Sequence, residues 1–292
     1  MRIRLGTRGS RLALAQSELV AGRLRRSGQE VEVVVLQTEG DLRPLDLTPG
    51  EGVFVAALAR ALLAGEIDLA VHSAKDVPLE EDLELCIAAY PERADPRDAL
   101  VTREGGRTLE TLPKGARVGT DSPRRSGFLR AARPDLRVVP LHGNVDTRLD
   151  RLDAGAADAL VLAAAGVDRL ERSARIDTRL PPEVVPPAPG QGALAVQARR
   201  RDRGLLATLR RLDNREVRLA VEVERRVLDA TGGGCRAPVG ALAALDGQLN
   251  LVAAAVSEDG ERRLLLRRRV APGAALQAAE EMGRELAARV RL

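Results

Sequence analysis

Short apolar runs alternate with amphipathic segments through the first two thirds of the chain. The runs are rich in Val, Ile and Leu, and they predict β-strands at residues 2–6, 31–37, 67–71, 117–119, 136–141 and 159–162. Between them, apolar positions recur at helical spacing, which predicts helices at residues 12–24, 53–63 and 145–152. This alternation of strands and helices indicates layered α/β structure.

The last third of the chain has a different pattern. Apolar runs at residues 239–245, 249–257 and 262–270 are separated by the turn pairs Asp246-Gly247 and Asp259-Gly260. Such turns join antiparallel strands into hairpins, and residues 274–290 then form a closing helix. We therefore expect a C-terminal α+β domain with a three-stranded antiparallel sheet. A cluster of prolines at residues 181–190 indicates a hinge or a crossing between domains.

Composition indicates a globular protein with an aliphatic core. Of the 292 residues, 45% are hydrophobic, and Phe54, Tyr90 and Phe128 are the only aromatic residues. The chain has 46 basic and 42 acidic residues, a net charge of +4, and nearly all of its bases are arginine. So few aromatic side chains, and almost as many acids as bases, disfavour a nucleic-acid partner.

Targeting and metal-binding signals are not found in the sequence. The N-terminus lacks the apolar segment of a signal peptide, and no apolar run is near the length that a bilayer requires. We therefore expect a cytoplasmic protein with no membrane partner. Two cysteines and two histidines, none in a metal-ligand spacing, make neither a disulfide framework nor a metal site.

Two loops of the α/β part resemble each other and favour anion binding. Residues 5–13 and 118–126 both run from a strand through Gly-Thr and a polar turn with arginine into a helix. Ser122 is a good N-cap, but Arg124 and Arg125 then occupy the first helical turn, where a cation opposes the helix dipole. We prefer an anionic ligand to a solvated surface pair as the explanation, and Arg8 and Arg148 repeat the pattern.

Two further loops carry weaker signals. Residues 70–78 leave an apolar strand and enter a turn that bears Lys75 and Asp76, either a surface ion pair or part of a ligand site at the strand end. Residues 189–195 match the dinucleotide pattern GxGxxA. They follow prolines instead of a strand, however, so a turn that crosses between domains is favoured over a nucleotide site.

The two cysteines differ in their surroundings. Cys86 lies in the apolar run Leu-Cys-Ile-Ala and is expected to be an inert buried thiol. Cys235 follows three consecutive glycines in a turn close to a proline. Three glycines lose much backbone entropy on folding, which indicates that bare or closely approached backbone is needed there. We infer that a reaction partner has to reach the sulfur of Cys235.

Taken together, the ordered motifs resemble those of the porphobilinogen deaminase (hydroxymethylbilane synthase) family, at residues 6–16, 71–78, 95–99, 143–149, 189–193 and 232–235. The resemblance covers nearly the whole chain. It implies two α/β domains like those of periplasmic binding proteins on either side of a cleft, and a third α+β domain. The expected divisions are residues 1–91 with 193–210, residues 97–186, and residues 215–292.

The resemblance also implies a monomeric transferase of tetrapyrrole biosynthesis. Its cofactor is a dipyrromethane joined by a thioether to Cys235. Porphobilinogen units add to this primer with loss of ammonia, and hydrolysis then releases hydroxymethylbilane. The family pattern implies that Asp76 is catalytic and that a polar set binds the cofactor: Asp41, Ser73, Lys75, Thr120, Ser122, Arg124, Arg125 and Arg148. Substrate contacts are implied for Arg8, Ser10, His142 and Arg148.

Three positions depart from the family pattern. His142 stands where arginine is common, Glu51 where lysine is usual, and Asp121 in a loop that is usually richer in serine. Asp121 and Glu51 place negative charge near an expected anion site. An alternative hypothesis from a different class is a noncatalytic two-domain binding protein for small polyanions, although such a protein has no need of a reactive cysteine.

Overall fold

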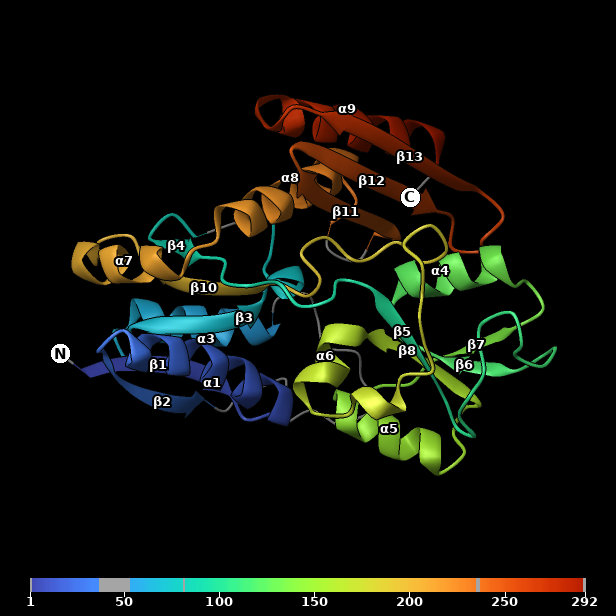
Figure 1. Ribbon diagram of the computed structural model, residues 1–292, viewed down its shortest axis with the longest axis horizontal. Coiled ribbons are helices and arrows are strands. Elements are labelled where there is room, and N and C mark those ends of the chain that lie inside the picture. The colour runs from blue at the N-terminus through green and yellow to red at the C-terminus, as the bar shows by residue number, and fades with distance from the viewer. Residues whose placement is uncertain (1, 37–52, 81, 235–236, 291–292) are drawn as a thin grey trace. The chain divides into compact units, whose positions relative to one another are not determined.

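The computed structural model describes residues 2–36, 53–80, 82–234 and 237–290 (Figure 1). The chain divides into two compact units, each formed by two segments. The first unit contains residues 1–94 and 193–218, and the second contains residues 95–192 and 219–292. Each expected α/β domain falls within one unit. The C-terminal segment groups with the second unit, and the three-domain division stays a prediction.

The sheet of the first unit has the strand order β2-β1-β3-β10-β4. β1 runs parallel to both β2 and β3, whereas β10 is antiparallel to β3 and β4. The five strands are β1 (Arg2–Arg8), β2 (Glu30–Leu36), β3 (Leu69–Ser73), β4 (Leu85–Ala89) and β10 (Leu194–Arg199). The other elements are α1 (Arg11–Arg26), α3 (Val53–Leu63), η1 (Ala74–Asp76), α7 (Arg203–Leu209) and η3 (Arg210–Leu212).

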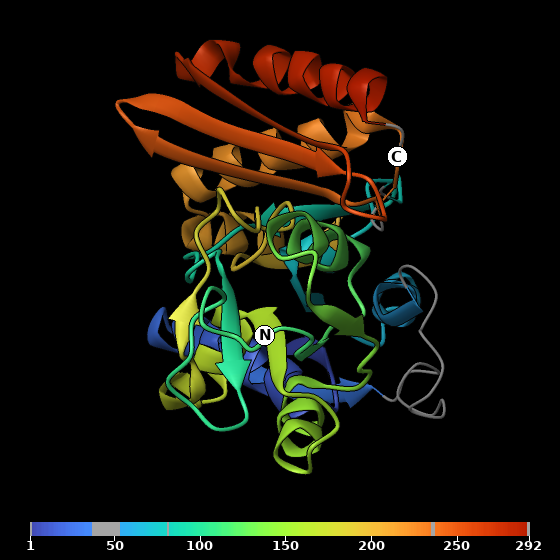
Figure 2. The ribbon, with the colours of Figure 1, turned by 90° about the vertical axis from the view of Figure 1, so that its right-hand side faces the viewer.

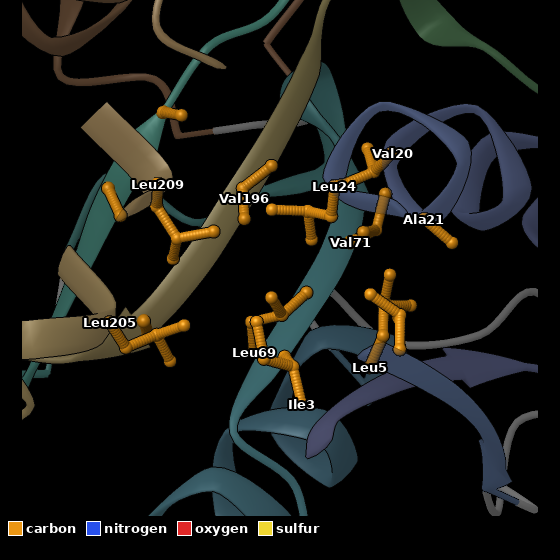
Figure 3. Close-up of a cluster of buried hydrophobic side chains, with 14 of the residues drawn as sticks. Ile3, Leu5, Val20, Ala21, Leu24, Leu69, Val71, Val196, Leu205 and Leu209 are labelled. Atoms are coloured by element: carbon orange, nitrogen blue, oxygen red, sulfur yellow. The ribbon is translucent and has the colours of Figure 1, made fainter. Parts of the chain in front are cut away.

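The core of the first unit is aliphatic, as the composition predicts. Val20 and Leu24 of α1 pack over Val71 and Val196 of the sheet (Figure 3). A second cluster, which includes Leu58 and Leu62 of α3, covers other sheet residues. Burial of such side chains is the main stabilising contribution to folding, at about 25 cal/mol for each Å² of apolar surface.

The sheet of the second unit repeats the arrangement of the first, with the order β7-β6-β8-β5-β9. β6 is parallel to β7 and β8, and β5 is antiparallel to β8 and β9. The strands are β5 (Asp98–Thr102), β6 (Arg117–Gly119), β7 (Arg137–Val139), β8 (Ala159–Ala163) and β9 (Thr178–Arg179). The helices are α4 (Pro123–Ala132), α5 (Val145–Asp153), α6 (Ala164–Arg169) and η2 (Ser173–Arg175).

The C-terminal segment forms the expected antiparallel meander. Its strands β11 (Val239–Asp246), β12 (Gln248–Val256) and β13 (Arg263–Val270) pair in sequence order. Helix α9 (Ala275–Arg289) lies along one face of this sheet, after the short turn η4 (Pro272–Ala274) (Figure 2). Helix α8 (Arg215–Thr231) leads into the segment. The predicted fold class, two α/β sheets and a three-stranded antiparallel sheet, is confirmed.

The two similar loops have a common structural reason for their glycines. A side-chain carbon added to Gly6 would lie 2.3 Å from Ile67, and one added to Gly119 would lie 2.7 Å from Leu160. Both distances are shorter than carbon atoms tolerate, so a larger residue at either position would force a buried side chain to shift.

Within the described ranges, no helix is long and apolar enough to cross a membrane.

Candidate functional site

The first unit gathers five predicted site residues at one edge of its sheet. β1 and β3 are parallel neighbours, so their carboxyl ends meet at the same edge, where ligands bind in α/β sheets. Arg8 ends β1, and the side chain of Ser10 caps α1 by accepting a hydrogen bond from the amide of Ala13 at 3.3 Å. Ser73 ends β3, and Lys75 and Asp76 follow in η1.

Gln16 links the two strand ends, and the sequence analysis missed it. Its side-chain amide, buried on α1, donates to the Ser73 hydroxyl at 2.8 Å. A buried amide at a helical position that faces a strand end is the signal that marks such a residue. Gln16 therefore fixes the orientation of a hydroxyl that is predicted to contact the cofactor.

The Lys75–Asp76 turn is anchored by buried neighbours, but its carboxylate is exposed. Val77 is buried, whereas the Asp76 side chain is exposed to solvent. His72, one residue before Ser73, is buried against Gln197, with 3.1 Å between Nε2 and Oε1. Burial lowers the pKa of His72 to about 4, only partly offset by the Gln197 bond, so its imidazole is neutral at pH 7. The turn thus presents a carboxylate on a rigid strand end.

The second unit places Arg124 and Arg125 around one buried carboxylate. Asp98 is fully buried, and the two arginines are 4% and 6% exposed. Arg124 Nη1 lies 2.8 Å from Asp98 Oδ2, and Arg125 Nη2 lies 2.8 Å from Oδ1. The solvated surface pair considered in the sequence analysis is therefore wrong: part of the anion that these arginines require is a carboxylate of the chain itself.

Asp98 also receives a hydrogen bond from Gln191, in the loop that matched GxGxxA. Gln191 Nε2 donates to Asp98 Oδ1 at 3.0 Å and to the carbonyl of Pro96 at 2.8 Å. Burial alone raises the pKa of Asp98, but the two guanidinium groups outweigh it and hold the pKa well below the ordinary value. The loop supports the arginine pair, and the boundary between the two units falls directly after Gly192.

Asp121 and His142, two residues that differ from the family pattern, are in contact with each other. His142 Nδ1 lies 3.1 Å from Asp121 Oδ1, and Arg148 Nη2 lies 3.5 Å from Asp121 Oδ2. Arg148 also donates from Nε to the carbonyl of Gly143 at 2.7 Å. Burial lowers the pKa of Arg148, Asp121 opposes that effect, and the nearby charge of Arg125 adds to it. The Arg148 and Arg125 charges are thus close enough to interact.

Thr120 and Ser122 line the turn that carries the arginine pair. The amide of Ser122 donates to the Thr120 hydroxyl at 3.3 Å, and the Ser122 hydroxyl accepts from the amide of Arg125 at 3.4 Å. The N-cap predicted from the sequence is confirmed. Because β6, β7 and β8 are parallel, this turn lies at the carboxyl edge of the second sheet.

Arg169 is a further cation of this edge that the sequence analysis missed. It ends α6, the helix that directly follows β8, and its Nη2 donates to the carbonyl of Gly192 at 2.6 Å. Burial lowers its pKa to about 10, partly offset by Asp168, so the guanidinium is charged at neutral pH. The chain has so many arginines that nothing in the sequence distinguishes Arg169 from an ordinary surface arginine.

Positive charge exceeds negative charge at the edge of the second sheet. The guanidinium groups of Arg124, Arg125 and Arg148 meet the carboxylates of Asp98 and Asp121, a net charge of +1 before Arg169 is included. Desolvated excess charge is unfavourable unless an anion shares the site. A ligand with several carboxylates, such as the expected dipyrromethane, fits this requirement. Asp41, Glu51 and Cys235 lie outside the described residues.

Comparisons with known proteins agree on one family. The model of "Porphobilinogen deaminase, dipyromethane cofactor binding domain" matches residues 3–207, and that of "Porphobilinogen deaminase, C-terminal domain" matches residues 218–291. The porphobilinogen deaminase of Acidothermus cellulolyticus is 51% identical over 98% of this chain and 87% of its own. That of Cutibacterium acnes is 52% identical over 83% of this chain and 77% of its own.

One solved structure to which the chain is similar is the second substrate binding domain of a putative amino acid ABC transporter from Streptococcus pneumoniae, with a TM-score of 0.46 and 16% identity. That alignment covers 72% of this chain and 91% of the other.

Proposed function

Because the chain belongs to the porphobilinogen deaminase family, we propose that its two sheet edges bind the carboxylates of porphobilinogen and of a dipyrromethane cofactor. The protein is an enzyme of tetrapyrrole biosynthesis, a hydroxymethylbilane synthase. It joins porphobilinogen units stepwise to the primer with loss of ammonia and releases hydroxymethylbilane by hydrolysis. Family membership contradicts the alternative of a noncatalytic binding protein.

The observation that carries the site assignment is the excess of buried and partly buried guanidinium charge in the second unit. Arg124, Arg125 and Arg148 bind acetate and propionate groups of the cofactor, and the planar guanidinium group suits such carboxylates. Asp98 and Gln191 hold the first two of these arginines in place. Thr120 and Ser122 add hydroxyl groups to the same turn.

The dipyrromethane, when bound, supplies the pyrrole carbon to which the first substrate unit is joined. We assign its attachment to Cys235, whose thiol is the strongest nucleophile available in this part of the sequence. Ser73, oriented by Gln16, and Lys75 contribute further cofactor contacts from the first unit. Asp41 is the last of the residues that we propose to contact the cofactor.

Asp76 is the proposed catalytic residue. Loss of ammonia from porphobilinogen leaves positive charge conjugated with the pyrrole nitrogen, and an ionised carboxylate stabilises such charge. The exposed carboxylate of Asp76 stands on a short helix at the end of a buried strand, beside Lys75. It can therefore also accept a proton from the ring and return it to a leaving group.

Arg8 and Ser10 are proposed to bind the substrate at the edge of the first sheet. Arg8 ends β1, and Ser10 caps the helix that follows, so both sit at a helix N-terminus that favours anions. His142 and Arg148 are the proposed substrate contacts of the second unit. A monomeric state and a place in the cytoplasm remain proposals that rest on the family.

The function itself is tested by incubating the purified enzyme with porphobilinogen and measuring ammonia and hydroxymethylbilane together. We expect four ammonia molecules for each linear tetrapyrrole, because the product contains four pyrrole units. Ammonia release without a tetrapyrrole product would contradict the proposed sequence of reactions.

The contact between His142 and Asp121 predicts an effect on substrate binding. His142→Arg is expected to lower KM for porphobilinogen by roughly twofold to fivefold, the size of a partly exposed ion pair. Because Asp121 lies 3.1 Å from the His142 ring, it would pair with the new guanidinium, and the gain should be larger in an Asp121→Ser background. Steady-state kinetics of the single and double variants measure this. An unchanged KM in both backgrounds would place the contact at another residue.

A further inference from the structure

The first unit contains a cavity that the proposed function does not use. It lies beside β4, the edge strand of the sheet, and has a volume of about 380 Å³, within the usual range of small-molecule sites. Segments far apart in the sequence form its walls: Cys86, Ile87, Ala88, Leu206, Arg210, Asp213, Arg215 and Arg218. Cys86 is half-buried there, so the expectation that its thiol is buried is wrong.

The cavity carries a net positive charge. Among the described residues that line it, Asp213 is the only acid, and it pairs with Arg218, with 2.7 Å between Arg218 Nε and Asp213 Oδ2 and 2.9 Å between Nη2 and Oδ1. Arg218 also lies 5.0 Å from the centre of the Tyr90 ring. Arg210 and Arg215 are exposed and form no ion pair with any described residue. Two guanidinium groups are therefore left to face a ligand.

The position of Arg215 adds an independent reason to expect an anion. Arg215 is the first residue of α8, where a cation opposes the helix dipole. Asn214 Oδ1 accepts hydrogen bonds from the amides of Glu216 and Val217, which fixes this helix start beside the cavity. Glu216, the acidic residue of the same turn, does not line the cavity. An anion in the cavity would offset the unfavourable position of Arg215 at this helix start.

The thiol of Cys86 is held in the same wall. Cys86 pairs with Ala198 of β10, and its Sγ lies 3.7 Å from the Ala198 carbonyl oxygen. The strand fixes the sulfur in the wall of the cavity that Arg210 and Arg215 also line.

We propose that this cavity binds small polycarboxylate anions and directs anionic low-molecular-mass disulfides to Cys86. The Cys86 thiol first gives its proton to solvent. The thiolate then attacks one sulfur of the disulfide, a new S–S bond forms to Cys86, the original S–S bond breaks, and the second half leaves as a thiolate. The disulfide is the oxidant, and the product is a mixed disulfide on β4. This inference stands apart from the proposed function.

The test compares two disulfides on the cofactor-loaded enzyme: dithiobis(nitrobenzoate), a dianion, and dithiodipyridine, which is uncharged. In Arg210→Gln/Arg215→Gln, the rate ratio of the anionic to the uncharged reagent should fall about tenfold, as expected for lost electrostatic attraction. The control variant Arg203→Gln/Arg211→Gln removes the same charge from exposed residues of this segment that do not line the cavity, and it should keep the ratio. Cys86→Ser should abolish the fast reaction.

A competition experiment tests binding without covalent chemistry. Citrate should slow the reaction of dithiodipyridine with the native enzyme and should have no effect on the Arg210→Gln/Arg215→Gln variant. An equal fall of the ratio in both double variants would overturn the proposal, because bulk charge would then explain it. Failure of citrate to protect the native thiol, or absence of reaction at Cys86, would overturn it as well.

Discussion

Replacing Asp76 with alanine is expected to lower kcat by about a hundredfold to ten-thousandfold, the usual contribution of a positioned general acid or base. The dipyrromethane should stay attached, because attachment uses the thiol of Cys235. Because the Asp76 side chain is exposed, its loss leaves no buried polar group unpaired, and the variant should unfold at the same temperature as the native enzyme. Steady-state kinetics and intact-protein mass together measure these effects.

The matched control for this variant is Glu80→Ala. Glu80 is an exposed carboxylate four residues further along the same segment, and its loss removes the same charge. We expect nearly native turnover for Glu80→Ala. If Asp76→Ala also turned over at the native rate, Asp76 would have no part in the mechanism.

Replacing Asp98 with asparagine is expected to destabilise the protein by about 3–5 kcal/mol at pH 7, the usual cost of removing one partner of a buried ion pair. The change leaves Arg124 and Arg125, both buried, without a countercharge. The two arginines should then lose their fixed orientation, so less of the purified protein should carry the cofactor. Thermal unfolding and the fraction of cofactor-loaded protein measure the two effects.

The effect of Asp98→Asn should depend on pH in a defined direction. The folded protein holds the pKa of Asp98 below its unfolded value of about 3.9, so its contribution is complete above that pH and decreases as the pH falls below it. The difference in unfolding temperature between native and variant proteins should therefore be constant from pH 7 to pH 5 and should narrow below about pH 4.

Asp158→Asn provides the control for Asp98→Asn. Asp158 pairs with Arg117 at 3.1 Å, but both side chains are more than one third exposed. Ion pairs of this kind contribute roughly 0–1 kcal/mol. Equal destabilisation by the two variants would contradict the assignment of Asp98 as the buried centre of the arginine cluster.

Most of the fold followed from hydrophobic periodicity, and the missed strands have a common cause. The apolar runs predicted β1, β2, β3, β6, β7 and β8, which are the parallel strands of the two sheets and extend from the centre of each sheet to one edge. The strands β4, β5, β9 and β10 were not predicted, and all four pair antiparallel with distant segments. β9 has only two residues, and β4, β5 and β10 are short apolar runs that periodicity alone does not distinguish from buried loops.

The sequence allowed the positive charge of the candidate site to be predicted, but not the carboxylates with which its arginines form ion pairs. The unfavourable position of Arg124 and Arg125 at a helix start indicated an anion, and the structure supplies Asp98 as the first such partner. Asp98 lies 26 residues from Arg124, and its role depends on the pairing of β5 with β8, which periodicity does not reveal. For the same reason, His142 and Asp121 were judged separately although they form one pair.

The central claim, that Cys235 carries a dipyrromethane within a porphobilinogen deaminase, is tested most directly by the mass of the intact purified protein. We predict a mass above that of the chain by one dipyrromethane, further species one pyrrole unit heavier after addition of limiting porphobilinogen, and the bare chain mass for Cys235→Ser. A folded native protein with the bare chain mass, or an adduct that persists in Cys235→Ser, would contradict the claim.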